Sequence, residues 1–175
     1  MPSRSGSRSR SSLTRFDELL TAILVVAILL LVAVYLPSNA RRSYSGPAHV
    51  IDGDSLVVGQ VETRLIGIDA PELGQMCLLD RKPWRCGEAA KAALHGMIAG
   101  HNVTCEGEGR DQYDRVLAVC SIGDRELNRE MVENGWAVAF GAYDAQEKIA
   151  RSGELGLWVS EFDRPEQWRE MFKGT

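Results

Sequence analysis

The residues best suited to chemistry in this 175-residue chain are carboxylates and arginines that fall in three short segments. Residues 50–55 contain two aspartates, residues 64–72 contain an arginine and two further carboxylates, and residues 110–115 add a second arginine, Arg115. Carboxylate oxygens suit a hard divalent cation, and the planar guanidinium group suits a phosphate. Together the three segments indicate hydrolysis of a phosphodiester bond.

The acidic residues are spaced so that they can share one cation. Asp52 and Asp54 lie two residues apart, so they face the same side of an extended chain. Asp69 and Glu72 follow an apolar strand, at the point where that strand is expected to end. Asp54, Asp69 and the backbone carbonyl of Ala70 therefore predict part of an oxygen shell for calcium. Neither cysteine nor histidine falls in these segments, which disfavours zinc and iron.

Each motif also has a simpler interpretation. An Asp-Gly-Asp sequence is an ordinary solvated turn in many proteins. Arg64 could be a charge on a surface strand, and Arg115 could pair with Asp111 or Asp114. Only the combination of both arginines with the carboxylates favours a functional site.

Short β segments followed by helices are expected to position these residues. Strands are predicted over residues 55–58, 61–68, 102–106 and 116–122, with a two-residue turn at Gly59 and Gln60. Helices are predicted over residues 88–99, from a cap at Asn128 to residue 134, and from a capping box at residues 144–147 to residue 153. An aromatic tail is expected to dock as a short amphipathic helix. This pattern indicates an α+β domain built on a small β-barrel.

The N-terminal region has a different composition. Residues 1–18 are rich in serine and arginine and are expected to be disordered. Residues 19–36 are uncharged and predict a transmembrane helix, followed by a linker over residues 37–45 and a domain over residues 46–175. The arginines before the apolar run favour a cytoplasmic N-terminus at the inner membrane, with the domain in the periplasm or outside the cell. The alternative is secretion after signal-peptide cleavage near Ala40.

Charge limits how the chain can hold a polyanion. Without the four arginines and two acidic residues of the first eighteen positions, 16 basic and 22 acidic residues remain, a net charge of −6. A domain that holds nucleic acid by bulk electrostatics is normally basic. Binding of nucleic acid by this domain must therefore be local and assisted by a metal ion.

Four cysteines, Cys77, Cys86, Cys105 and Cys120, all follow the apolar run. An even number of cysteines in an oxidising compartment predicts disulfides, for which three pairings are possible. We favour Cys77–Cys86, which closes a short loop, and Cys105–Cys120, which joins two neighbouring strands. A zinc site is the weaker alternative because no C-x-x-C pair is present.

Residues 50–55, 64–72 and 111–115 resemble, in order and spacing, the signature segments of the staphylococcal nuclease (thermonuclease) family. The likeness covers nearly all of residues 46–160. It implies a five-stranded OB barrel with three helices and a calcium-dependent nuclease that hydrolyses DNA or RNA. No protein partner is predicted.

The resemblance also implies a role for each acidic residue. Asp54 and Asp69 would bind calcium directly, together with the backbone carbonyl of Ala70. Asp52 would support these ligands without touching the ion. Glu72 would position or deprotonate the attacking water.

Two arginines and a tyrosine complete the implied site. Arg64 and Arg115 would hold the phosphate and stabilise the charge that builds up in the transition state. Tyr113 would contact a neighbouring phosphate. The family has lysine and glycine where this chain has Gln112 and Asp114, and this exchange weakens local attraction of anions.

Some members of the family have lost the catalytic set. The alternative function is therefore a non-catalytic OB module that binds nucleic acid or protein at the membrane.

Overall fold

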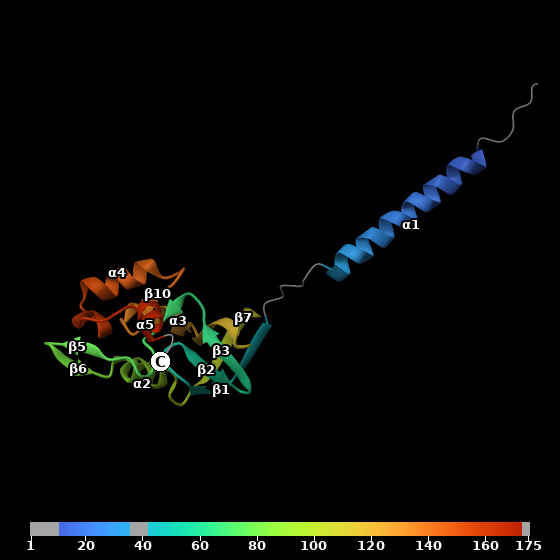
Figure 1. Ribbon diagram of the computed structural model, residues 1–175. Coiled ribbons are helices and arrows are strands. Elements are labelled where there is room, and N and C mark those ends of the chain that lie inside the picture. The colour runs from blue at the N-terminus through green and yellow to red at the C-terminus, as the bar shows by residue number, and fades with distance from the viewer. Residues whose placement is uncertain (1–10, 36–41, 173–175) are drawn as a thin grey trace, which may run out of the picture. The chain divides into compact units, whose positions relative to one another are not determined.

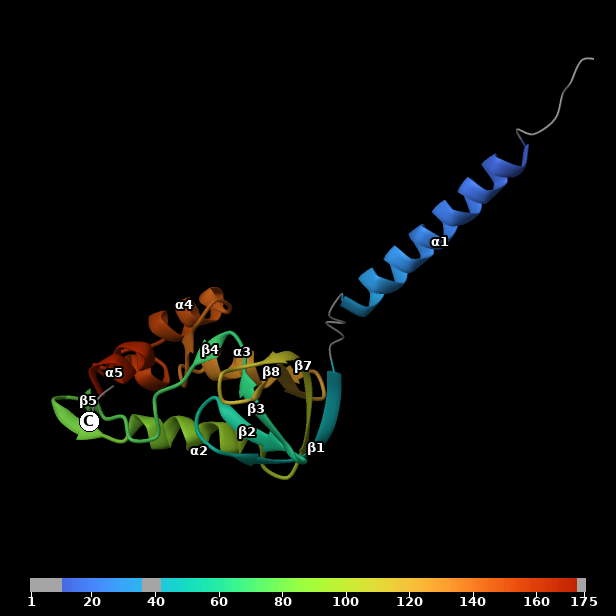
Figure 2. The same cartoon turned by 45° about the vertical axis from the view of Figure 1, so that its right-hand side comes forward.

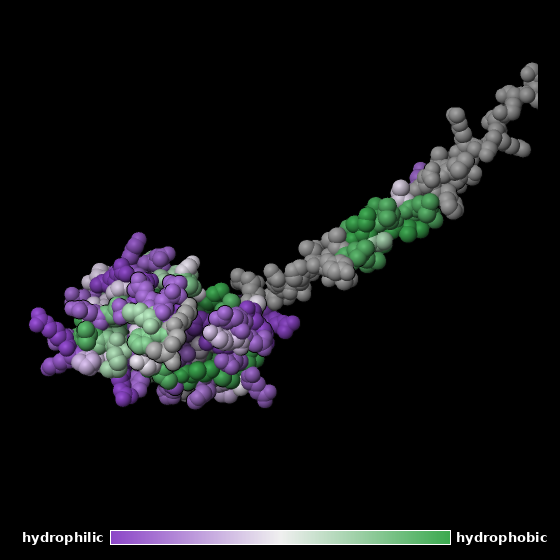
Figure 3. Space-filling model, viewed as in Figure 1, coloured by the Kyte–Doolittle hydropathy of each residue, from purple (hydrophilic) through white to green (hydrophobic). Residues whose placement is uncertain are grey.

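The computed structural model describes residues 11–35 and 42–172, and the chain divides into two units, residues 1–39 and 40–175. The described part of the first unit is a helix, α1 (Ser11–Tyr35), whose described apolar side chains are exposed and green in Figure 3. The helix begins at Ser11, within residues 1–18, for which we expected disorder; residues 1–10 lie outside the described residues. Each residue that extends an existing helix adds one hydrogen bond, which favours a helix that begins before the apolar run at Leu19.

The transmembrane helix expected over residues 19–36 is not supported. A membrane-spanning helix needs about 20 predominantly apolar residues. Within the described part of the chain, no helix is apolar over enough residues to cross a bilayer. Residue 36 itself lies outside the described part.

Five strands of the second unit close into a barrel (Figures 1 and 2). They are β1 (Arg42–Val50), β2 (Ser55–Val58), β3 (Val61–Leu65), β7 (Asn102–Arg110) and β8 (Val116–Ile122). Antiparallel neighbours follow the order β3-β2-β1-β7-β8, and a parallel pairing of β3 with β8 closes the barrel. A short strand, β9 (Arg125–Glu126), pairs with β8. The predicted five-stranded OB-type barrel is confirmed.

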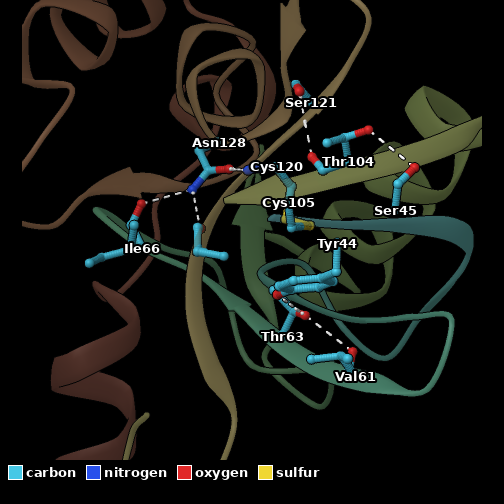
Figure 4. The surroundings of a disulfide bond; sticks show 11 residues. Tyr44, Ser45, Val61, Thr63, Ile66, Thr104, Cys105, Cys120, Ser121 and Asn128 are labelled. Carbon is cyan, nitrogen blue, oxygen red and sulfur yellow. Dashed lines mark hydrogen bonds between the residues drawn. A yellow bond between two sulfur atoms is a disulfide. The ribbon is translucent and has the colours of Figure 1, made fainter. Parts of the chain in front are cut away.

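Strand β1 begins earlier than expected. Residues 42–45, which we assigned to a linker, pair with β7, so that Tyr44 lies opposite Cys105. The Tyr44 hydroxyl forms a 2.7 Å hydrogen bond with the Thr63 hydroxyl (Figure 4). The polar composition of residues 42–45 did not indicate a strand, because this strand is stabilised by its pairing with β7. The rest of the expected linker, residues 37–41, lies outside the described part.

The predicted strand over residues 61–68 is split in two. Gly67 adopts a φ of 83°, a left-handed conformation that favours glycine and turns the chain after β3. The short strand β4 (Ile68–Asp69) then pairs with β10 (Val138–Ala139). This turn brings the carboxylate of Asp69 to the end of the barrel.

Four helices, a 3₁₀ turn and a hairpin cover the barrel in the described part of the second unit. The helices are α2 (Cys86–Ile98), α3 (Leu127–Glu133), α4 (Asp144–Ser152) and α5 (Pro165–Phe172), with the 3₁₀ turn η1 at Gly156–Val159. The hairpin consists of β5 (Cys77–Leu79) and β6 (Lys82–Trp84). In both ribbon views, α4 and α5 lie at the same end as this hairpin, away from β1 and β2.

Two expected helix caps are wrong. Asn128 does not cap α3, because it lies inside the helix and its fully buried amide bonds to the barrel backbone (Figure 4). Helix α4 follows Tyr143, which makes no capping side-chain bond. Glu147, the expected partner in the capping box, instead accepts a hydrogen bond from the Ala139 N–H. Asn128 and Glu147 thus bond to other parts of the domain, whereas sequence reasoning assigned them to the caps of their own helices.

Both predicted disulfides are present, and they account for all four cysteines. Cys105–Cys120 joins β7 to β8, with the two Cα atoms 4.1 Å apart (Figure 4). Cys77–Cys86 joins the β5–β6 hairpin to the start of α2. The second disulfide therefore holds the loop that follows Glu72 against the body of the domain.

Candidate active site

The three sequence segments meet at one open cavity of about 640 Å³. Nearly all of the expected site residues line it: Asp52, Asp54, Arg64, Ala70, Glu72, Tyr113 and Arg115. Asp69 is almost completely buried beside it and touches the cavity residue Arg64. The fold therefore gathers side chains from the β1–β2 turn, β3, the segment after β4 and the β7–β8 loop.

Arg64 links two buried carboxylates. Its Nη1 donates to Asp54 Oδ1 at 2.7 Å, and its Nη2 donates to Asp69 Oδ1 at 2.9 Å. Arg64 is partly exposed, whereas Asp54 and Asp69 are only 3% and 1% exposed. Strand pairing explains the contact, because Arg64 lies opposite Ser55, the residue after Asp54.

Asp54 lies in an unusual electrostatic environment. The pKa of its carboxyl is raised to about 7, mainly by burial and to a smaller extent by the charges of Asp52 and Asp69. The Arg64 guanidinium and the Ala70 N–H, which donates to Asp54 Oδ2 at 3.0 Å, act in the opposite direction. Asp52 supports the turn, since its Oδ1 accepts a hydrogen bond from the Asp54 N–H.

Arg115 is held in place by Asp111 and Ser55. Its Nε and Nη2 both bond to Asp111 Oδ2, and its Nη1 donates to Ser55 Oγ at 3.0 Å. Although burial opposes the change, the bonds from Arg115 lower the pKa of Asp111. The exposed Tyr113 ring lies 5.2 Å from the Arg115 guanidinium carbon. Arg115 thus forms the expected pair with Asp111 and still lines the cavity.

The backbone around Glu72 is held by Gln75, a fully buried residue that sequence reasoning missed. The Gln75 Oε1 accepts from the Glu72 N–H at 3.2 Å, and the Gln75 N–H donates to the Glu72 carbonyl at 2.7 Å. Gly87, at the start of α2, packs directly on the same backbone. A Cβ atom at position 87 would lie 1.8 Å from the Glu72 carbonyl oxygen.

We expect Gly87→Ala to reduce the turnover rate about tenfold, because the new methyl group must displace the Glu72 backbone and small misplacements of reacting groups are costly. The overpacking should also destabilise the fold by about 1–3 kcal/mol. Steady-state kinetics and thermal denaturation would measure both effects.

Gly96→Ala is the matched control, since a Cβ at this position of α2 meets nothing within 4 Å. It should keep full activity and stabilise the helix by up to about 1 kcal/mol. Equal activity of the two variants would contradict the role assigned to Gly87.

A third arginine completes the cavity wall. Arg169, on α5, lines the cavity and bonds to both Asp69 and Glu72. The hydrogen bonds that Arg169 donates to Asp69, and to a smaller extent to Glu72, raise its pKa above the ordinary arginine value. Sequence reasoning expected this tail only to dock as a short amphipathic helix and gave its arginine no role in the site.

The residues present offer oxygen donors to a cation. Among the described side chains, no three from histidine, cysteine, aspartate and glutamate converge as a metal site. The available set consists of two buried carboxylates, Asp54 and Asp69, with Ala70 beside them. This set is chemically suited to a hard cation such as calcium, which also accepts backbone carbonyls and water.

Comparison with known proteins adds an independent observation. The model of the family described as "Staphylococcal nuclease homologue" matches residues 62–160. The chain is 34% identical over 129 residues to a succinoglycan biosynthesis protein, ExoI, of Rhizobium meliloti, covering 69% of this chain and 68% of that protein. It is 30% identical over 164 residues to an uncharacterized endonuclease of Haemophilus influenzae, covering 86% of each. A probable staphylococcal-like nuclease, CAN4, of rice is 32% identical over 125 residues, 67% of this chain and 23% of that protein.

Proposed function

Because the chain belongs to the staphylococcal nuclease family, we propose that it is a nuclease that hydrolyses phosphodiester bonds of DNA or RNA with the help of calcium. The convergence of Arg64, Arg115 and Glu72 on one cavity with two buried aspartates is the observation that supports this proposal. The similarity to an endonuclease over most of the chain supports the same class of reaction.

Asp54, Asp69 and the Ala70 carbonyl would hold the cation, and Asp52 would support Asp54 through its backbone bond. When bound, calcium would polarise the phosphoryl oxygen of the substrate. The fit rests on oxygen donors alone, with both carboxylates removed from bulk water.

The remaining side chains of the cavity would act on the substrate directly. Glu72 would orient the attacking water and accept its proton. Arg64 and Arg115 would hold the phosphoryl oxygens and stabilise their increasing charge. Tyr113, exposed at the rim, would contact the neighbouring phosphate.

A degradation assay on the purified protein tests the proposal. We expect cleavage of plasmid DNA or of an RNA substrate with calcium present and loss of cleavage in a chelator. Glu72→Ala should slow the reaction by about a hundredfold or more. Activity that persists in the chelator would refute the role of calcium. Substrate binding without any cleavage would favour the alternative, a non-catalytic OB module.

We also propose that the domain is exported from the cytoplasm. Two disulfides that use every cysteine support this location, because such bonds persist in oxidising compartments. Cell fractionation with N-terminal sequencing would test it, and recovery of the reduced protein from the cytoplasm would contradict it.

A further inference from the structure

The guanidinium of Arg169 bridges two carboxylates that have separate proposed roles. Its Nη1 donates to Asp69 Oδ1 at 3.0 Å and to Glu72 Oε1 at 2.8 Å, and its Nη2 donates to Asp69 Oδ2 at 2.9 Å. The Asp69 side chain is 2% exposed, whereas that of Glu72 is 36% exposed. A buried, fixed carboxylate is thus connected through one planar group to a more exposed carboxylate.

The segment that presents Arg169 is anchored at its start by two neighbouring residues. Arg164, directly before α5, donates to both oxygens of Glu147 and to the Ala139 carbonyl. The carbonyl of Asp163 accepts a 2.7 Å hydrogen bond from Gln75 Nε2, on the same side chain that bonds to the Glu72 backbone. The start of α5 and the Glu72 loop therefore share a buried amide.

The charges at the cavity are consistent with Arg169 as a permanent component. When all of them are ionised, the carboxylates of Asp52, Asp54, Asp69 and Glu72 and the guanidinium groups of Arg64 and Arg169 leave a net charge of −2, which a divalent cation would neutralise. The Arg115–Asp111 pair, which also lines the cavity, adds no net charge. Each carboxylate oxygen can accept about two hydrogen bonds or ligand contacts. Asp69 Oδ2 accepts one bond, from Arg169, in this arrangement and keeps capacity for a cation.

We propose that Arg169 is a positioning residue of the nuclease site, which holds the Glu72 carboxylate at a fixed place relative to Asp69. This inference rests on the proposed function of Glu72. Without the bridge, a side chain as exposed as that of Glu72 can rotate between several rotamers, and only some of them direct its oxygens at the attacking water. The C-terminal helix is therefore a component of the active site.

Substitution of Arg169 tests the inference in the full-length protein. Arg169→Ala should lower kcat about 10- to 100-fold, the usual cost of losing a group that orients another, with little change in KM. Arg169→Lys keeps the charge but not the planar fork, so it should recover part of the loss. Arg125→Ala is the control, because it removes a two-bond arginine–glutamate pair, with Glu130, that does not line the cavity. This variant should keep the wild-type rate.

A double-mutant cycle with Glu72→Gln shows whether Arg169 acts through Glu72. If it does, Arg169→Ala should cost much less in the Glu72→Gln background than in the wild type, because the group to be positioned is already inactive. If Arg169→Ala reduces kcat by the same factor in both backgrounds, Arg169 does not act through Glu72 and the inference is overturned.

Calcium binding without substrate, measured by calorimetry, provides a readout other than activity. The dissociation constant of Arg169→Ala should stay within about tenfold of the wild type. Calcium binding that is tighter by more than this, with higher activity at low calcium, would mean that Arg169 competes with the cation and would overturn the inference. A fully active Arg169→Ala protein would overturn it alone, whereas an inactive wild type would overturn the proposed function as well.

Discussion

Arg115→Ala should reduce kcat about 100- to 1000-fold. Its guanidinium lines the cavity and is held by Asp111 and by Ser55 Oγ, so it would meet the substrate without having to reorganise. Preorganised cations stabilise a transition state most when their orientation is already fixed. Single-turnover kinetics with a labelled oligonucleotide would measure the loss in the chemical step.

Arg110→Ala, at the end of β7 beside the loop that carries Arg115, is the control. Arg110 pairs with Asp114, is about half exposed and does not line the cavity. It should therefore leave kcat within about threefold of the wild type, as surface substitutions usually do. Arg115→Lys should recover little activity, because an ammonium group cannot reproduce the bonds to both Asp111 and Ser55. Equal losses for Arg110→Ala and Arg115→Ala would contradict a specific role of Arg115.

The contacts among the acidic residues and Arg64 could be predicted from sequence because they are local. Arg115, which contacts Ser55 across 60 residues, was given its role by the family resemblance. Asp54 lies directly before β2, and Arg64 lies on β3, which a two-residue turn joins to β2. Because Arg64 pairs with Ser55, its contact with the neighbouring Asp54 follows from strand pairing. Asp69 follows after the Gly67 turn, and its contact with Arg64 spans five residues. In such segments spacing and alternation are enough to show which side chains meet.

Arg169 could not be predicted in this way. It contacts Asp69 across 100 residues, and its position depends on how Arg164 and Gln75 anchor the end of the chain. No periodicity in the tail indicates which face of an eight-residue helix meets a carboxylate. The partner of a long-range contact is set by packing of the whole domain.

Asn128 shows a similar limit at a single residue. An asparagine near the start of a helix is a frequent cap, because its side chain can bond to free backbone N–H groups. Here the same hydrogen-bonding capacity is used toward β8 and the chain after β3 instead. Residue type predicted that Asn128 would bond to backbone, and only the fold determined which backbone.

Asn128→Ala should therefore destabilise the domain by about 3–5 kcal/mol, a large part of the stability of an ordinary domain. Its Oδ1 accepts from the Cys120 N–H at 3.0 Å, and its Nδ2 donates to the carbonyls of Ile66 and Ala118 at 2.9 and 3.1 Å (Figure 4). Alanine would leave the Cys120 N–H and the Ile66 carbonyl without this partner, at about 1–3 kcal/mol for each group that stays buried and unpaired. The Ala118 carbonyl would keep the bond from the Ile66 N–H. Urea denaturation with the disulfides intact would measure the change.

Asn134→Ala, at the other end of α3, is the control. It removes an asparagine that does not bond to the barrel. The Asn134 amide is exposed and donates one hydrogen bond, to the Glu130 carbonyl, so its removal should cost no more than about 1 kcal/mol. Asn128→Asp should be intermediate or worse than alanine, since a carboxylate can accept from Cys120 but cannot donate to the two carbonyls. If Asn128→Ala unfolds at the same urea concentration as Asn134→Ala, the buried amide does not hold β8 to the chain after β3. The register that places Arg64 beside Asp54 would then depend on strand pairing and the Cys105–Cys120 disulfide.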